Sequence, residues 1–276
     1  MQTSILKYLP FGLILLASCG TGTTEKPVDS EAGTITTPAI PAPASIGLQI
    51  SAAYPHDDSA YTQGLEVYGG KIYESTGDFA NSSIRIYDIK TGKIIKKHVM
   101  GTKEIFGEGI TIFRNKIYQL TWQNNLVNVY DLNKIDKPEK TFSWPLEGWG
   151  ITHHADELII SDGSANIFFV NPDDFKIKRT IQVIDQQGPV DNLNELEMID
   201  GFLYANVYMK DHIVKIDLSN GHVVGRIDLP GLIRQYAPQF NPKEGEVLNG
   251  IAYDSTSRKV YITGKHWPKL FEASIR

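Results

Sequence analysis

The chain lacks residues and motifs that several protein classes require. A single cysteine, Cys19, occurs in 276 residues, so no disulfide can form within one chain. The 27 lysines and arginines do not outnumber the 32 acidic residues and form no basic cluster, so no nucleic-acid partner is expected. The Gly-x-Ser-x-Gly elbow of serine hydrolases is also missing. The fold must therefore hold without covalent cross-links, and its chemistry must come from other groups.

The remaining composition is typical of a globular all-β protein. Apolar residues make up 41% of the chain and charged residues 21%, which is enough to build a packed core. Helical periodicity is scarce after residue 48, while Gly, Asn and Asp recur between short apolar runs. This pattern predicts short strands joined by tight turns.

The N-terminus predicts export. Lys7 precedes an apolar stretch from Tyr8 to Ala17, which is shorter than the roughly 20 residues of a membrane-spanning helix. The stretch ends in Leu16-Ala17-Ser18-Cys19-Gly20, which resembles a bacterial lipobox. Residues 1–18 are therefore predicted to be a signal peptide and Cys19 the lipidated first residue of an exported lipoprotein in the cell envelope, on the periplasmic side or the outer membrane. An ordinary secretory peptide or an uncleaved anchor is the alternative.

Residues 19–47 are rich in Thr, Pro, Ala, Ser and Gly. The prolines in the run Thr36 to Pro43 keep the chain extended, and the segment carries too little apolar surface to fold alone. We expect a flexible tether there, followed by one folded domain over residues 48–276.

A repeat runs through that domain. Five segments begin with a polar or aromatic residue, a mostly small second residue and an aliphatic one, and a second strand follows about nine residues later. The segments start at Gln63-Gly64-Leu65, Glu108-Gly109-Ile110, Trp149-Gly150-Ile151, Asn194-Glu195-Leu196 and Asn249-Gly250-Ile251.

The repeat length predicts the fold. Successive starts are roughly 41 to 55 residues apart, the length of one four-stranded propeller blade. We therefore predict a five-bladed β-propeller with four-stranded antiparallel blades. The last unit is one strand short, and residues 47–52 could supply that strand and join the two ends of the chain. A β-sandwich is the alternative, but it does not explain five matched starts.

Propeller geometry brings the equivalent residues together. The first strand of each blade lines the central channel, so the five starting residues should form a ring near one mouth of it. A second equivalent position, four residues beyond the second-strand tyrosine, holds Trp122, Tyr208 and Lys265 in three of the blades. The ring is predicted to consist of Gln63, Glu108, Trp149, Asn194 and Asn249.

Glu108 is the candidate acid and base of this ring. It is the only ionisable ring member, and burial beside Phe106, Trp122 and Trp149 would favour its neutral form and raise its pKa. Amides such as those of Gln63 and Asn249 could equally satisfy backbone groups. The adjacent histidines at 153 and 154 would point to opposite faces of a strand, so no metal site is predicted from them.

These segments resemble the plant-type glutaminyl cyclases, the five-bladed propeller family of glutaminyl-peptide cyclotransferases found in plants and bacteria. The resemblance covers residues 48–276. It rests on Tyr61-Thr62-Gln63-Gly64-Leu65, Phe106-Gly107-Glu108-Gly109-Ile110, Glu147-Gly148-Trp149-Gly150, Asn192-Leu193-Asn194-Glu195-Leu196-Glu197, Val247-Leu248-Asn249-Gly250-Ile251-Ala252 and the closing segment 263–272.

The resemblance implies a metal-independent conversion of N-terminal glutamine to pyroglutamate, with Glu108 as the catalytic residue. It implies no required cofactor, although a structural divalent cation in the channel is compatible with it, and it implies peptides or proteins with N-terminal glutamine as substrates. A monomer is expected. The family pattern has Phe at Tyr61 and Trp at Tyr208, so an aromatic wall is kept at both positions. The implied substrate-binding residues are Gln63, Trp122, Trp149, Asn194, Tyr208, Lys265, Phe106, Tyr61 and Asn249.

Two other functions stay open. A calcium-dependent propeller hydrolase could use the oxygen donors of the ring, although one carboxylate offers little charge for a tightly bound cation. A binding propeller with a vestigial pocket would release no ammonia from any glutamine peptide.

Overall fold

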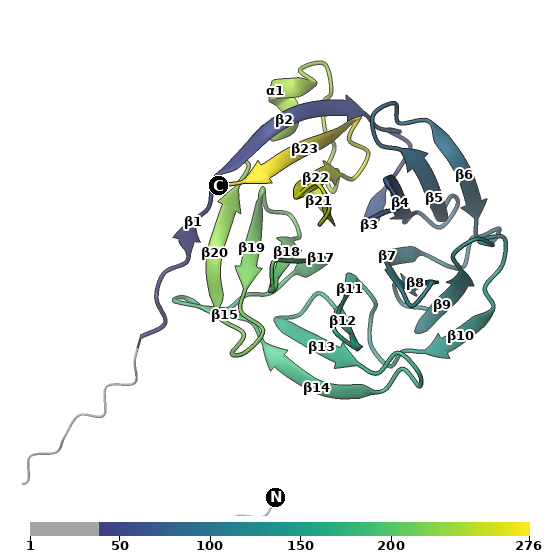
Figure 1. Cartoon of the computed structure of the whole chain (residues 1–276), viewed down its shortest axis with the longest axis horizontal. Coiled ribbons are helices and arrows are strands. Elements are labelled where there is room, and N and C mark those ends of the chain that lie inside the picture. Colours follow the sequence, from purple (N-terminus) through teal and green to yellow (C-terminus); the bar gives the residue numbers. More distant parts are fainter. Residues whose placement is uncertain (1–38) are drawn as a thin grey trace, which may run out of the picture. The chain divides into compact units, whose positions relative to one another are not determined.

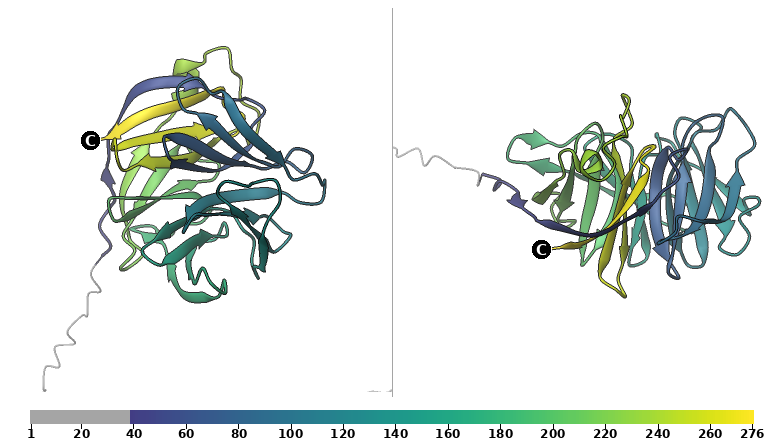
Figure 2. Two further views of the ribbon diagram at one scale, coloured as in Figure 1. Left: turned by 45° about the vertical axis from the view of Figure 1, so that its right-hand side comes forward. Right: turned by 90° about the horizontal axis from the view of Figure 1, so that it is seen from above.

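The computed structural model describes residues 39–276, which form five small antiparallel sheets around a central axis (Figure 1). Seen from the side, the sheets stand next to one another around that axis (Figure 2). The five-bladed propeller is therefore confirmed. The predicted signal peptide, Cys19 and most of the predicted tether lie outside the described residues. No helix in the described part of the chain is long and apolar enough to cross a membrane.

Three blades are continuous in sequence, each running from the innermost strand outward. The first contains β3 (Thr62–Tyr68), β4 (Lys71–Thr76), β5 (Ser83–Asp88) and β6 (Ile94–Val99). The second contains β7 (Gly107–Phe113), β8 (Lys116–Thr121), β9 (Leu126–Asp131) and β10 (Lys140–Ser143). The third contains β11 (Ile151–His154), β12 (Glu157–Ser161), β13 (Asn166–Val170) and β14 (Ile177–Gln182).

The other two blades borrow a strand from the N-terminal end of the domain. The fourth contains β17 (Leu193–Ile199), β18 (Phe202–Val207), β19 (His212–Ile216), β20 (Val223–Asp228) and the added β1 (Ala44–Ser45). The fifth contains β21 (Leu248–Asp254), β22 (Lys259–Gly264), β23 (Lys269–Ile275) and β2 (Leu48–Pro55). A short hairpin and one helical turn complete the structure as β15 (Ile184–Asp185), β16 (Gly188–Pro189) and α1 (Leu232–Tyr236).

The ring is closed by pairing the two ends of the domain, as predicted. Strand β2 runs antiparallel to β23 over its whole length, with Leu48 opposite Ile275 and Pro55 opposite Lys269 (Figure 1). Strand β1 pairs in parallel with the outer edge of blade four, with Ala44 opposite Gly225. Because β1 falls within residues 19–47, the paired chain begins before residue 48, where the composition alone placed the start of the domain.

The innermost strands pack so closely that the second position of each repeat is nearly always glycine. A β-carbon on Gly64 would lie 2.4 Å from the backbone nitrogen of Ile110 in the next blade. Blade four has Glu195 at this position, and its buried carboxylate accepts hydrogen bonds from the N–H groups of Leu65 (3.1 Å) and Ile251 (2.7 Å). The departure from the repeat therefore links three blades at the channel.

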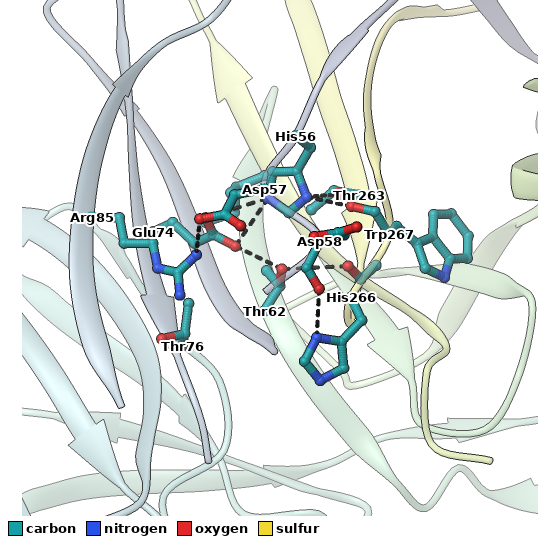
Figure 3. A network of polar contacts seen from close by, with 12 residues as sticks. His56, Asp57, Asp58, Thr62, Glu74, Thr76, Arg85, Thr263, His266 and Trp267 are labelled. Carbon is teal, nitrogen blue, oxygen red and sulfur yellow. Dashed lines mark hydrogen bonds and ion pairs between the residues drawn. The ribbon is translucent and has the colours of Figure 1, made fainter. Parts of the chain in front are cut away.

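A buried polar cluster fastens the closing strand to the first blade (Figure 3). We call His56, Thr62, Glu74 and Trp267 the closure clasp. The Nδ1–H of His56 donates to the carbonyl of Trp267 (2.6 Å), its Nε2 faces the carboxylate of Glu74 (3.2 Å), and Thr62 donates to the same carboxylate (2.6 Å). Burial disfavours the charged imidazole, but the Glu74 carboxylate more than offsets this, so the pKa of His56 is raised. The clasp therefore joins the residue that follows β2, strands β3 and β4, and the segment that follows β22.

Candidate active site

Breaks in strand register orient the side chains of the predicted ring residues. In four blades the innermost strand begins with a register break against its neighbour, and such bulges redirect side chains. The breaks fall between Thr62 and Gly64, Gly107 and Ile110, Leu193 and Leu196, and Leu248 and Ile251. Inside them lie Gln63, Glu108, Asn194 and Asn249.

Three of these residues, Gln63, Glu108 and Asn194, meet around a cavity of about 250 Å³. The lining contains nine of the ten residues that the sequence nominated for catalysis and substrate binding. They are Tyr61, Gln63, Phe106, Glu108, Trp122, Trp149, Asn194, Tyr208 and Lys265.

Asn249 is the tenth and does not line the cavity. It is fully buried behind Gln63, and its Nδ2 donates to the carbonyl of Thr62 (3.0 Å) and to Oε1 of Gln63 (3.4 Å). In this structure Asn249 therefore holds a pocket residue rather than facing the pocket. Its repeat position is equivalent to that of Glu108, but equivalence along the chain does not decide which side chain faces the cavity.

Gln63 bridges the two ionisable groups of the pocket. Its Nε2 donates to Oε1 of Glu108 (3.0 Å), and its Oε1 accepts a hydrogen bond from Nζ of Lys265. Glu108 is only 5% exposed and forms no ion pair with any residue of the described chain. The carboxyl therefore meets a neutral amide instead of a cation.

The pocket shifts the acidity of both groups. Burial raises the pKa of Glu108 well above its usual range; the positive charge of Lys265 opposes this, and the negative charge of Glu147 adds to it. Burial lowers the pKa of Lys265 to about 8, against the opposing effect of Glu108. Burial therefore moves the pKa of each group away from its usual value in the direction of neutral pH, which suits acid and base catalysis.

Two tyrosines surround the Lys265 ammonium. Its Nζ lies 4.5 Å from the ring centroid of Tyr61 and 5.4 Å from that of Tyr208, within the range of cation–π attraction. These are the two positions at which the chain departs from the family pattern. Both replacements keep an aromatic face on the lysine.

The remaining walls are aromatic rings in edge-to-face contact. Trp149 meets Tyr208 at 5.8 Å between centroids and Phe106 meets Trp122 at 5.8 Å. The second repeat position explains part of this packing, because blade one has Gly77 where blade two has Trp122. A β-carbon on Gly77 would lie 2.2 Å from the ring of Phe106, so the missing side chain makes room for that wall.

Asn194 supplies a free polar group to the cavity. The residue is 3% exposed, and its Oδ1 has no hydrogen-bond partner among residues 39–276. Buried acceptors are nearly always paired in folded proteins. An unpaired one in a cavity lining is suited to accept a hydrogen bond from a ligand.

Glu147 is a site residue that repeat analysis missed. One of its oxygens, Oε2, accepts hydrogen bonds from both indole N–H groups of the pocket, Trp122 (2.8 Å) and Trp149 (3.0 Å), while Oε1 accepts one from Gln123 (3.0 Å). Partial burial raises the pKa of Glu147, but these three hydrogen bonds lower it by more. The only sequence signal was its place in the motif Glu147-Gly148-Trp149-Gly150, because no other blade has an equivalent carboxylate.

Metal ligands are not grouped at the site. Nowhere in the described chain do three or more His, Cys, Asp or Glu side chains come together in a way that could hold a metal ion. The channel does contain Glu66 and Glu197 near Glu195, but each already accepts a hydrogen bond, from Thr111 and from the N–H of Tyr253. Burial raises the pKa of Glu66 to about 7.

Comparison with known proteins agrees with this geometry. The family model described as glutamine cyclotransferase matches residues 17–275. A glutaminyl-peptide cyclotransferase of Arabidopsis thaliana is 34% identical over 231 residues, which cover 83% of this chain and 71% of that protein. The crystal structure of a Myxococcus xanthus glutaminyl cyclase superposes with a TM-score of 0.78 at 34% identity, covering 84% of this chain and 98% of that chain.

Proposed function

The chain belongs to the glutamine cyclotransferase family, and on that premise we propose that it closes the N-terminal glutamine of peptides into pyroglutamate and releases ammonia. The observation that carries the proposal is a buried carboxyl, Glu108, held by an amide at an aromatic pocket. In this reaction the α-amine attacks the γ-carbonyl carbon of the same residue, and the bond from that carbon to the amide nitrogen breaks. The nucleophile belongs to the substrate, so no serine or cysteine is needed.

The pocket walls would impose the reactive conformation. A free glutamine side chain samples many extended rotamers, whereas attack requires the amine to lie next to the carbonyl carbon of the side-chain amide. Rigid walls made by Trp122, Trp149 and Tyr208 reduce that freedom, and holding reacting groups at short range can supply a large share of the rate. Asn194 Oδ1 is free to accept a hydrogen bond from the amine and so to orient it.

Glu108 would move the protons. Gln63 occupies its Oε1, which leaves Oε2 without a hydrogen bond from residues 39–276. That oxygen can take a proton from the attacking amine and return one to the departing nitrogen, which leaves as ammonia. Lys265, joined to the same amide, would stabilise the negative charge that develops on the γ-carbonyl oxygen.

We propose that this reaction needs no metal ion. The oxygen donors around the cavity are two amides, two tyrosine hydroxyls and one carboxyl, and the positive charge of Lys265 works against a cation there. A structural cation in the channel stays a prediction.

An ammonia-release assay tests the proposal. A short peptide with N-terminal glutamine should release ammonia in the presence of the protein and of a metal chelator, and mass spectrometry should show the loss of 17 mass units, roughly one ammonia per peptide. A calcium-dependent hydrolase would lose its activity with the chelator and regain it with calcium. No release from any glutamine peptide would contradict the proposal and leave a binding propeller.

We propose further that the enzyme is a monomer displayed in the bacterial cell envelope by a lipid on Cys19. The support is the lipobox-like sequence at residues 16–20 and the proline-rich segment that separates it from the propeller. Mass spectrometry of the mature N-terminus and membrane fractionation of a Cys19→Ala variant test the anchor, and light scattering of the protein without its lipid tests the monomer. Recovery of Cys19→Ala in the membrane fraction at the wild-type level would contradict the lipid anchor, and a mass larger than that of one chain in light scattering would contradict the monomer.

A further inference from the structure

An exposed phenylalanine, Phe79, lies beside the pocket without being part of its lining. It belongs to the loop between β4 and β5 of blade one and is 45% exposed. Its ring contacts two pocket walls, Phe106 edge-on at 5.2 Å and Trp122 at 6.4 Å between centroids. The aromatic wall of the pocket therefore continues outward onto the surface through Phe79.

Phe79 differs from the other exposed apolar side chains of the described chain. Ile95, Val99, Ile177 and Val224 lie on the outer strands β6, β14 and β20, where isolated apolar residues are common. Met209 is also exposed and follows the pocket residue Tyr208, but Phe79 is the exposed phenylalanine of the described chain, and its ring contacts two pocket walls. Exposing an aromatic ring at that place costs hydrophobic free energy unless a ligand covers it.

The loop that presents Phe79 is braced against the catalytic strand. Asp78, with φ of 86°, accepts hydrogen bonds through its side chain from the N–H of Ala80 (3.0 Å) and from Asn81 (2.8 Å). Ser82 Oγ donates to the carbonyl of Asp78 (2.6 Å) and accepts from the N–H of Gly107 (3.0 Å), the residue before Glu108. The position of Phe79 is thus tied to the backbone that carries the proton-transfer group.

Phe79 extends one side of the pocket rim, over which a bound peptide would leave. If the N-terminal glutamine occupies the cavity, as the proposed function requires, the rest of the peptide has to leave through the mouth. We infer that Phe79 contacts the side chain of the second substrate residue and favours large apolar or aromatic residues there. This inference rests on the proposed function and adds a specificity-determining residue to it.

The test compares substrates that differ only in the second residue. Values of kcat/KM are measured for the amides of Gln-Phe, Gln-Leu and Gln-Gly, and for glutaminamide, with the wild type, Phe79→Ala and Phe79→Leu. Loss of an aromatic contact should lower kcat/KM for Gln-Phe about two- to tenfold in Phe79→Ala. The loss should be smaller for Gln-Leu and smallest for Gln-Gly and glutaminamide, because a smaller second residue makes less contact. The kcat/KM of Phe79→Leu for Gln-Phe should lie between the values of the wild type and Phe79→Ala.

Tyr68→Ala is the matched control. Tyr68 is also an exposed aromatic residue, at 41%, but it ends β3 while Gln63 lies near its start, which places the two about 17 Å apart along the strand. This variant should keep the wild-type preference among the four substrates.

Three outcomes are distinguishable. Equal losses of kcat/KM on all four substrates, glutaminamide included, would mean that Phe79 only supports the pocket walls. Wild-type kcat/KM values on all four substrates in both Phe79 variants would mean that the second residue does not touch it. Either result overturns the inference while the wild type remains active. Absence of ammonia release from every substrate by the wild type would instead overturn the proposed function. Thermal melting of each variant separates these results from misfolding.

Discussion

Two buried carboxyl groups, Glu74 and Glu108, differ in whether they have a charged partner. Glu74 in the closure clasp is fully buried, pairs with His56 at 3.2 Å and accepts a hydrogen bond from Thr62 (Figure 3). Glu108 in the pocket is also buried, but its hydrogen-bond partner is the neutral amide of Gln63, the residue next to Thr62. Burying an unpaired charge is costly, and the structural carboxyl of Glu74 has a partner in His56. The carboxyl that must exchange a proton is left without a counterion, and its pKa rises.

The largest expected effect concerns the unpaired carboxyl. Glu108→Gln keeps the size of the side chain and removes its proton exchange, so kcat should fall by about 10²- to 10⁴-fold. The free energy of unfolding should not decrease, because no ion pair is lost. Steady-state ammonia release and urea unfolding of the same preparation measure both quantities. Near-wild-type turnover in this variant would refute the role given to Glu108.

The paired carboxyl should show the opposite result. Glu74→Gln leaves the buried His56 without its anion, and breaking a buried pair typically costs about 3–5 kcal/mol. Urea unfolding should show this loss. The control is Asp156→Asn, which removes an exposed pair with Arg114 and should cost less than about 1 kcal/mol. Equal stability of the two variants would show that the clasp does not hold the ring closed.

Glu147 tests whether the aromatic walls need their shared acceptor. Glu147→Leu removes the acceptor of both indole N–H groups, and two lost hydrogen bonds should reduce kcat/KM by roughly tenfold. Glu147→Gln keeps an acceptor oxygen and removes the charge that raises the pKa of Glu108. Its rate should fall less, and the limb of the pH profile that Glu108 contributes should move to lower pH.

The control for Glu147 is Glu104→Gln, which removes a nearby exposed carboxylate with no such contacts and should leave the pH profile in place. If Glu147→Gln and Glu147→Leu lose the same activity and neither shifts the profile, Glu147 is not a positioning residue.

The smallest expected effect is the pH dependence of the clasp. A histidine whose pKa is raised on folding stabilises the folded state fully below its unfolded value of about 6.5, and this contribution is lost as the pH rises through the folded pKa. The stability difference between the wild type and His56→Gln should therefore shrink from pH 6 to pH 9. Arg85 opposes the charged imidazole and is common to both proteins, as are the channel carboxyls, so their effects cancel. A difference that stays constant with pH would mean that folding does not shift the pKa of His56.

Much of the fold could be predicted from the sequence because a propeller is a repeat. Within each blade, alternating apolar and polar residues and the turn residues between them predict the strands. The five matched starts predict the number of blades. The same argument led to Glu108, since only one of the five ring positions is ionisable. Even the exception at Glu195 was visible as a break in the glycine pattern, although its hydrogen bonds to Leu65 and Ile251 were not.

Other features depended on contacts between blades, which no local pattern records. The repeat treats Asn249 and Gln63 as equivalent, yet one lies behind the other. Glu147 joins Trp122 and Trp149 across two blades, and β1 extends blade four from residues whose composition indicated a tether. The number of blades, the ring and its single carboxyl follow from periodicity along the chain, so they could be predicted before the fold was known. Which groups are paired could not be predicted, because pairing depends on where the closed ring places side chains that are far apart in sequence.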